Sequence, residues 1–103
     1  MARLIAILED GNEFAIELRE GQNSVGTDEN NDFSLFHDSI SSVHCMVTLT
    51  NGAAVLRDLG SAYGTFIGKE KVVEAEIEDG TVFHIGQIPV TLRLREEVAD
   101  VKI

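Results

Sequence analysis

The sequence predicts an all-β sandwich of short, mostly antiparallel strands, and two observations carry this prediction. Short runs of strand-forming residues recur at close spacing, separated by turn pairs such as Asn51-Gly52 and Asp79-Gly80. No stretch keeps an apolar period of 3.6 residues over three turns, so no amphipathic helix is expected. The 103 residues, 44% of them hydrophobic, suffice for the core of one such sandwich.

Alternation of apolar and polar residues, and the turns between the runs, define about ten strands. The expected strands are residues 3–8, 13–18, 24–26, 33–35, 44–50, 53–58, 65–67, 73–78, 81–85 and 88–94. The last run is the clearest, because every second residue from Ile88 to Leu94 is apolar. Residues 73–78 alternate apolar and acidic side chains, either as a strand or as an extended edge. Asn51-Gly52 predicts a tight hairpin.

The domain organisation and compartment follow from the chain's length and composition. We expect residues 1–95 to form one domain and residues 96–103 to be a C-terminal tail or linker stub. The apolar run near the N-terminus is too short for a signal peptide, and no stretch is long enough to span a membrane, so a cytoplasmic protein is expected. The single cysteine, Cys45, lies in an apolar strand pattern and is predicted to be a buried thiol.

The charge balance restricts the class of partner. Eight Lys and Arg residues against 18 Asp and Glu residues give a formal net charge of −10. Such a chain is a poor ligand for nucleic acid or for an anionic membrane, because both repel it. The expected partner is a protein or peptide, and a basic one if the charge has a role beyond solubility.

Two segments rich in small polar residues are the candidate functional loops. Residues 40–44 read ISSVH and residues 58–65 read DLGSAYGT. Glycine, serine and aspartate form tight loops that expose backbone N–H groups.

Together with Gly26, Asp79-Gly80 and Ile85-Gly86, these segments resemble the forkhead-associated (FHA) domain. The resemblance covers nearly the whole chain, with five motifs in the family's order and spacing. It implies an eleven-stranded β-sandwich whose loops at one end bind phosphothreonine peptides, typically in signalling proteins. It also implies a non-catalytic protein-interaction module in signalling or assembly, with no cofactor and no metal.

The resemblance assigns two sets of residues. The residues expected to hold the loops in shape are Gly26, His44, Asp58, Gly60 and Gly64. The residues at the family's phosphate-binding and peptide-binding positions are Thr27, Ser41, Ser42, Ser61 and Tyr63.

Three binding positions depart from the family pattern. Thr27 and Ser42 stand where the family has arginines, and Tyr63 stands where it has asparagine. Only Ser41 remains as a direct phosphate ligand. Tyr63 either anchors a partner or packs over its own loop with its hydroxyl in solvent.

The expected loops also lack permanent positive charge. Residues 20–56 and 58–68 contain no Lys or Arg. Phosphothreonine carries about −1.5 to −2 charges at pH 7 and is best held by charge-assisted donors. We therefore expect ordinary phosphothreonine recognition to be weak or lost.

The alternative is a functional phosphothreonine-binding domain that uses Ser41, backbone amides and an unusual cation. His37 is the nearest candidate by sequence. The strand at residues 65–67, at about 3.3 Å per residue, is expected to carry Lys69 and Lys71 to the far end of the sandwich.

Catalysis and metal binding are the remaining classes, and neither is expected. His44, Ser61 and Asp58 suggest a hydrolase triad, but no nucleophile-elbow signature surrounds the serine. His37, His44 and Cys45 suggest a metal site, but adjacent residues in a strand point to opposite faces, which prevents joint ligation.

Overall fold

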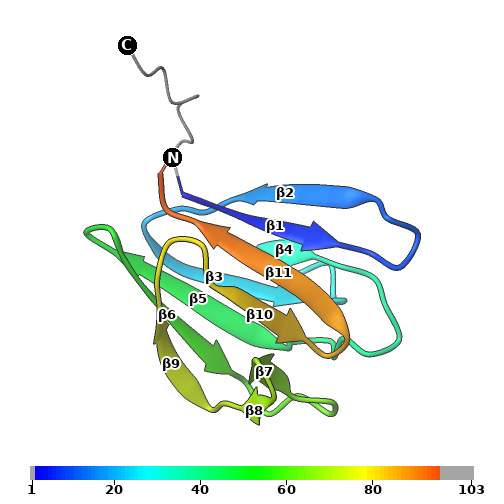
Figure 1. Cartoon of the computed structure of the whole chain (residues 1–103). Helices are drawn as coiled ribbons and strands as arrows, with labels where there is room; N and C mark the ends of the chain where they lie inside the picture. The colour runs from blue at the N-terminus through cyan, green and yellow to red at the C-terminus, as the bar shows by residue number, and fades with distance from the viewer. Residues whose placement is uncertain (1, 96–103) are drawn as a thin grey trace.

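The computed structural model describes residues 2–95, which form eleven strands and no helix (Figure 1). The strands are β1 (Arg3–Ile7), β2 (Glu13–Glu17), β3 (Gly21–Gly26), β4 (Phe33–Ser34), β5 (Cys45–Thr50), β6 (Ala53–Asp58), β7 (Thr65–Ile67), β8 (Glu70–Lys71), β9 (Glu74–Ile77), β10 (Val82–Ile85) and β11 (Ile88–Arg93). They make a six-stranded sheet, ordered β2-β1-β11-β10-β7-β8, and a five-stranded sheet, ordered β4-β3-β5-β6-β9. All pairs are antiparallel except β3 with β4.

The predicted all-β sandwich is therefore confirmed, with its core between the two sheets. β11 alternates buried and half-buried side chains along its whole length, as its sequence pattern predicts. The largest apolar side chains with no more than 1% exposure come from both sheets: Leu4, Phe83, Ile85, Ile88, Val90 and Leu92 from one, and Val25, Val47 and Leu56 from the other. Full burial of such a side chain contributes about 1.5–3 kcal/mol. Residues 96–103, the expected tail, lie outside the described residues.

The predicted hairpin at Asn51-Gly52 joins β5 to β6 in register, with Thr50 opposite Ala53. Asn51 and Gly52 have φ angles of 49° and 82°. Two successive left-handed residues match the right-handed twist of the flanking strands, which is why this dipeptide favours a two-residue turn.

β3 begins three residues earlier than its sequence predicts. Gly21 and Gln22 pair with Leu49 and Thr48 of β5, although the strand was expected only over residues 24–26. The early residues of the strand are polar, so they lack the apolar alternation that marks a half-buried strand. That expectation was wrong because a buried amide stabilises this part of the strand.

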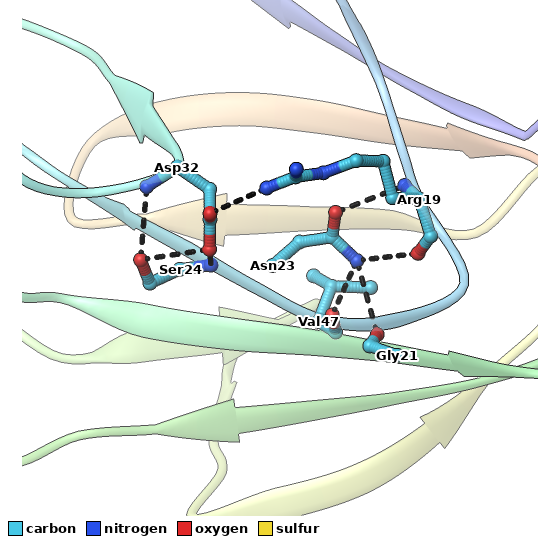
Figure 2. Close-up of polar contacts among 6 residues, drawn as sticks. All are labelled: Arg19, Gly21, Asn23, Ser24, Asp32 and Val47. Carbon is cyan, nitrogen blue, oxygen red and sulfur yellow. Dashed lines mark hydrogen bonds and ion pairs between the residues drawn. The ribbon is translucent and has the colours of Figure 1, made fainter.

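Asn23 supplies that amide. Its side chain is fully buried and donates to the carbonyl oxygens of Arg19, Gly21 and Val47 at 2.9, 3.1 and 3.1 Å (Figure 2). Its Oδ1 accepts from the Arg19 N–H at 3.0 Å. Burying an amide costs little free energy when its donors and its acceptor are all hydrogen-bonded, and these hydrogen bonds fix the backbone around it.

Asp32 anchors the loop that follows β3. Its carboxylate accepts from the Ser24 N–H at 2.8 Å and from the Arg19 guanidinium at 2.6 Å (Figure 2). The hydrogen bond from the Ser24 N–H is the main cause of a lowered pKa at Asp32. The contact holds residues 27–32 beside the edge of the sheet and engages Arg19 in an ion pair.

Candidate functional site

Four connections meet at the end of the sandwich away from the start of β1 and the end of β11 (Figure 1). They are the β3–β4 loop (residues 27–32), the β4–β5 loop (residues 35–44), the β6–β7 loop (residues 59–64) and the β10–β11 turn (residues 86–87). Backbone hydrogen bonds join them. The N–H groups of Thr27 and Asp28 donate to the carbonyls of Ser41 and Ser42 at 3.0 and 3.1 Å. We call these four connections the recognition loops, after the binding role that the resemblance to FHA domains implies for loops at one end of the sandwich.

The buried side chain of His44 links the β4–β5 loop to the β6–β7 loop. Its ring is fully buried, with Nδ1 accepting from the Ser41 N–H at 3.0 Å and Nε2 lying 2.9 Å from the Gly64 carbonyl oxygen. The two partners require the neutral ring with its proton on Nε2. Burial lowers the pKa of His44, and the Gly64 carbonyl and the Asp58 charge offset only part of that effect.

Asp58 organises the β6–β7 loop as a polar clamp. Its Oδ2 accepts from the N–H groups of Gly60 and Ser61 at 3.0 and 3.1 Å. Its Oδ1 accepts from the hydroxyls of Ser61 and Thr65 at 2.5 and 2.7 Å. Burial raises the pKa of Asp58, but these hydrogen bonds outweigh it and leave the pKa below its usual value. The Ser61 hydroxyl also accepts from the Gly64 N–H at 2.9 Å, so the loop closes on itself.

Two glycines permit close approach of the backbone in this region. Gly64 has a φ of +92°, and a Cβ there would lie 2.9 Å from the Lys71 Cε and 3.1 Å from the Phe66 ring. A Cβ on Gly26 would lie 2.1 Å from the carbonyl oxygen of Ser42. No side chain fits at either position without moving a neighbour.

The five residues at the family's binding positions have different environments. Ser41 is half-buried, and its Oγ accepts from the Ala62 N–H at 2.9 Å, which leaves the hydroxyl hydrogen for a ligand. Ser61 faces inward to Asp58, so its hydroxyl is already used. Thr27 is half-buried, whereas Ser42 and Tyr63 are exposed, Tyr63 by 61%.

Sequence reasoning misplaced one cation. Gly68, with a φ of +62°, turns the chain back after β7, so Lys71 pairs opposite Phe66 rather than continuing away. The Cε of Lys71 lies close to Gly64 of the β6–β7 loop, since a Cβ built on Gly64 would be 2.9 Å from it. The expectation that residues 65–67 carry Lys71 to the far end of the sandwich is wrong. The glycine after a three-residue strand was the available signal of a hairpin.

Sequence reasoning also missed a pocket beside Tyr63. The pocket has a volume of about 210 Å³ and is lined by Glu9, His37, Asp38, Ser39, Tyr63 and Gln87. Glu9 comes from the β1–β2 connection, and its Oε1 lies 2.7 Å from the His37 Nε2. Because 28 positions separate Glu9 from His37, no local pattern pairs them.

The candidate triad and metal set take other partners. The Ser61 hydroxyl bonds Asp58, and the His44 Nε2 bonds a backbone carbonyl, so the serine–histidine pair of a hydrolase is not formed. Cys45 is buried, and burial raises its pKa to about 12, which keeps the thiol protonated. Within residues 2–95, no three His, Cys, Asp or Glu side chains gather to hold a metal ion.

The family model of the FHA domain matches residues 23–86, more than half of the chain. The chain belongs to the FHA family. FHA domains are phosphothreonine-dependent protein-interaction modules. In the part of the chain that the structure describes, no helix is long and apolar enough to cross a membrane.

Named relatives agree with this assignment. The FHA domain-containing protein FhaA of Mycobacterium tuberculosis is 31% identical over 87 residues, covering 84% of this chain and 16% of FhaA. The FhaA FHA domain, solved in complex with the intracellular domain of Rv3910, has a TM-score of 0.78 at 30% identity, over 87% of this chain and 99% of that one. A further structure, from work on phosphothreonine-dependent FHA domain interactions, has a TM-score of 0.76 at 28% identity, over 92% of this chain and 99% of that one. The chain thus spans about one-sixth of the curated relative that it matches.

Proposed function

We propose that this FHA domain is a non-catalytic protein-docking module in which ordinary phosphothreonine recognition is weak or lost. The observation that carries the proposal is the identity of Thr27 and Ser42, which occupy the family's arginine positions in recognition loops that are joined by backbone hydrogen bonds. Because the loops keep their hydrogen bonds but lack the two arginine charges, we infer that they form a binding surface for a different ligand.

The energetic cost of the two missing arginines is large. A hydrogen bond to a charged group contributes about 1.5–3 kcal/mol, so two arginines account for about 3–6 kcal/mol. Each 1.4 kcal/mol is a factor of ten in affinity, so the loss is about 100-fold or more. The neutral donors that remain, the Ser41 hydroxyl and backbone N–H groups, contribute about 0.5–1.5 kcal/mol each.

The charges around the recognition loops oppose phosphate further. Carboxylates in these loops are Asp28, Glu29, Asp32 and Asp38, and only Asp32 is paired with an arginine. Charges within about 8 Å act on a bound phosphate at physiological salt. The negative potential of this end favours a ligand that is neutral or basic.

A second candidate function is phosphothreonine recognition with Lys71 as the unusual cation. The position of the Lys71 stem against Gly64 favours it, because the ammonium group extends from a carbon that lies beside the β6–β7 loop. Lysine binds phosphate as a point charge, without the two-point geometry of arginine. One lysine therefore replaces only part of what two arginines supply.

Location and partner class belong to the same proposal. We place the domain in the cytoplasm, bound to a protein partner and not to nucleic acid. The net charge of −10 and the single buried thiol support this assignment.

A parallel titration tests the proposed function. Fluorescein-labelled degenerate peptides with a central phosphothreonine are titrated with the domain, alongside the same peptides with plain threonine. Equal affinities support the proposal, and a preference for phosphothreonine above about tenfold contradicts it. If that preference appears, Lys71→Met and its matched control Lys69→Met decide whether Lys71 is the responsible cation.

A further inference from the structure

The pocket beside Tyr63 is built from four separate connections. Glu9 comes from the β1–β2 connection, Asp38 from the β4–β5 loop, Tyr63 from the β6–β7 loop and Gln87 from the β10–β11 turn. Its volume of about 210 Å³ is the size of a pocket for one side chain of a partner.

Ser39 and His37 hold the base of the pocket in place. Ser39 is 4% exposed, and its Oγ accepts from the Gln87 N–H at 2.9 Å. Its N–H donates to the His37 Nδ1 at 3.0 Å, and its Oγ lies 2.8 Å from the same nitrogen. These contacts fix the β10–β11 turn against the β4–β5 loop, so the base exists before any ligand binds.

The walls of the pocket are negative. The His37 Nε2 holds the Oε1 of Glu9 at 2.7 Å, which orients the carboxylate and leaves its second oxygen available to a ligand. Asp38 adds a second exposed carboxylate, and none of the six lining residues is Lys or Arg. An anion is repelled here, and an apolar side chain would desolvate two carboxylates without compensation.

Tyr63 provides an aromatic wall. The side chain is 61% exposed and lines the pocket together with the carboxylates. The face of a tyrosine ring attracts a Lys ammonium or an Arg guanidinium, and a neighbouring carboxylate pairs with the same group. An aromatic ring beside carboxylates is thus the chemistry that recognises a basic side chain.

We propose that this pocket binds the side chain of an arginine or lysine in an unphosphorylated segment of the partner. The inference rests on the proposed docking function and supplies its chemistry: the binding end selects a cation where its relatives select an anion. Tyr63, Glu9 and Asp38 determine the specificity.

The test uses a small probe, N-acetyl-arginine amide, titrated into the ¹⁵N-labelled domain. N-acetyl-citrulline amide is the control, because citrulline has the shape of arginine without its charge. Saturable shifts of the amide signals of Glu9, Asp38, Tyr63 and Gln87 with the arginine probe, about tenfold weaker with citrulline, are the expected result. Equal responses to the two probes, or no localised response to arginine, overturn the proposal.

Variants locate the effect within the domain. Glu9→Gln and Tyr63→Ala should each weaken the arginine probe several-fold, whereas Glu76→Gln, which removes an exposed carboxylate on β9, should not. An equal loss in Glu76→Gln would show that general charge, not the pocket, attracts the probe. The comparison of arginine with citrulline on the unchanged domain remains decisive if a variant does not fold.

The two proposals fail separately. Preference for phosphothreonine peptides overturns the proposed function, even where the arginine probe binds the pocket. Absence of arginine binding overturns the pocket assignment, even where phosphate preference is absent.

Discussion

His44 Nε2 donates to the Gly64 carbonyl at 2.9 Å, and this one contact joins two recognition loops through a buried imidazole. The opposite nitrogen accepts from the Ser41 N–H, so the neutral ring is bonded at both ends. Protonation would place a second N–H against the Ser41 N–H and a charge in a buried site, which is costly.

The domain should therefore lose stability as the pH falls below about 6.5. The pKa of His44 is lowered in the folded state, so between that value and about 6.5 the unfolded chain binds more protons, and acid favours unfolding. Urea titrations of the unchanged domain from about pH 7.5 to about pH 5 should show the free energy of unfolding falling as the pH falls. The free energy of unfolding should depend less on pH in His44→Gln, because this variant lacks the imidazole. An unchanged pH dependence in that variant would show that His44 is not its source.

His44→Gln should also lower the free energy of unfolding by about 2–4 kcal/mol at pH 7.5, because both hydrogen bonds of the buried ring are disturbed. His84→Gln is the matched control, since that half-buried residue takes no part in the loops. A similar loss in both variants would contradict a special role for His44.

Asp58→Ala should unfold the β6–β7 loop locally and cost about 2–4 kcal/mol. Four donors, from Gly60, Ser61 and Thr65, lose their acceptor at once. Urea unfolding measures the loss, and the amide spectrum reports the loop. Glu76→Gln should stay within about 0.5 kcal/mol of the unchanged domain, as expected for a surface site. If Asp58→Ala also lowered the free energy of unfolding by less than about 0.5 kcal/mol, the claim that Asp58 stabilises the β6–β7 loop would be contradicted.

Gly64→Ala should destabilise more than Gly11→Ala. Both glycines have a positive φ, of +92° and +86°, so the backbone strain is matched. A methyl group at Gly11 meets nothing within 4 Å, whereas one at Gly64 meets Lys71 and the Phe66 ring. We expect about 1 kcal/mol for Gly11→Ala and about 2–3 kcal/mol for Gly64→Ala. Equal losses in thermal or urea unfolding would show that crowding at Gly64 is absent.

Much of the fold follows from local patterns in the sequence. The alternation from Ile88 to Leu94 and the dipeptide Asn51-Gly52 predict β11 and the β5–β6 hairpin, because each depends only on neighbouring residues. The beginning of β3 does not follow, since Asn23 stabilises it through the carbonyl of Val47, 24 positions away.

The site was less predictable than the fold. Motif spacing predicted the positions of Ser41 and Tyr63. It did not predict that of Lys71, because the chain reverses direction at Gly68 and pairs Lys71 with Phe66 instead of continuing as a straight strand. The contact between Glu9 and His37 joins connections of the two sheets, and only the tertiary fold brings them together.

The central claim is that missing positive charge, and not a collapsed site, removes phosphothreonine recognition. The most direct measurement compares the unchanged domain with the variant Thr27→Arg/Ser42→Arg/Tyr63→Asn, titrated with phosphothreonine and threonine peptides. All three positions are exposed or half-exposed, so the fold should tolerate the changes. The variant should gain at least about 100-fold preference for phosphothreonine. The matched variant Thr27→Gln/Ser42→Gln/Tyr63→Asn should not. A folded arginine variant that still ignores phosphopeptides, or an unchanged domain that already prefers them, would contradict the account.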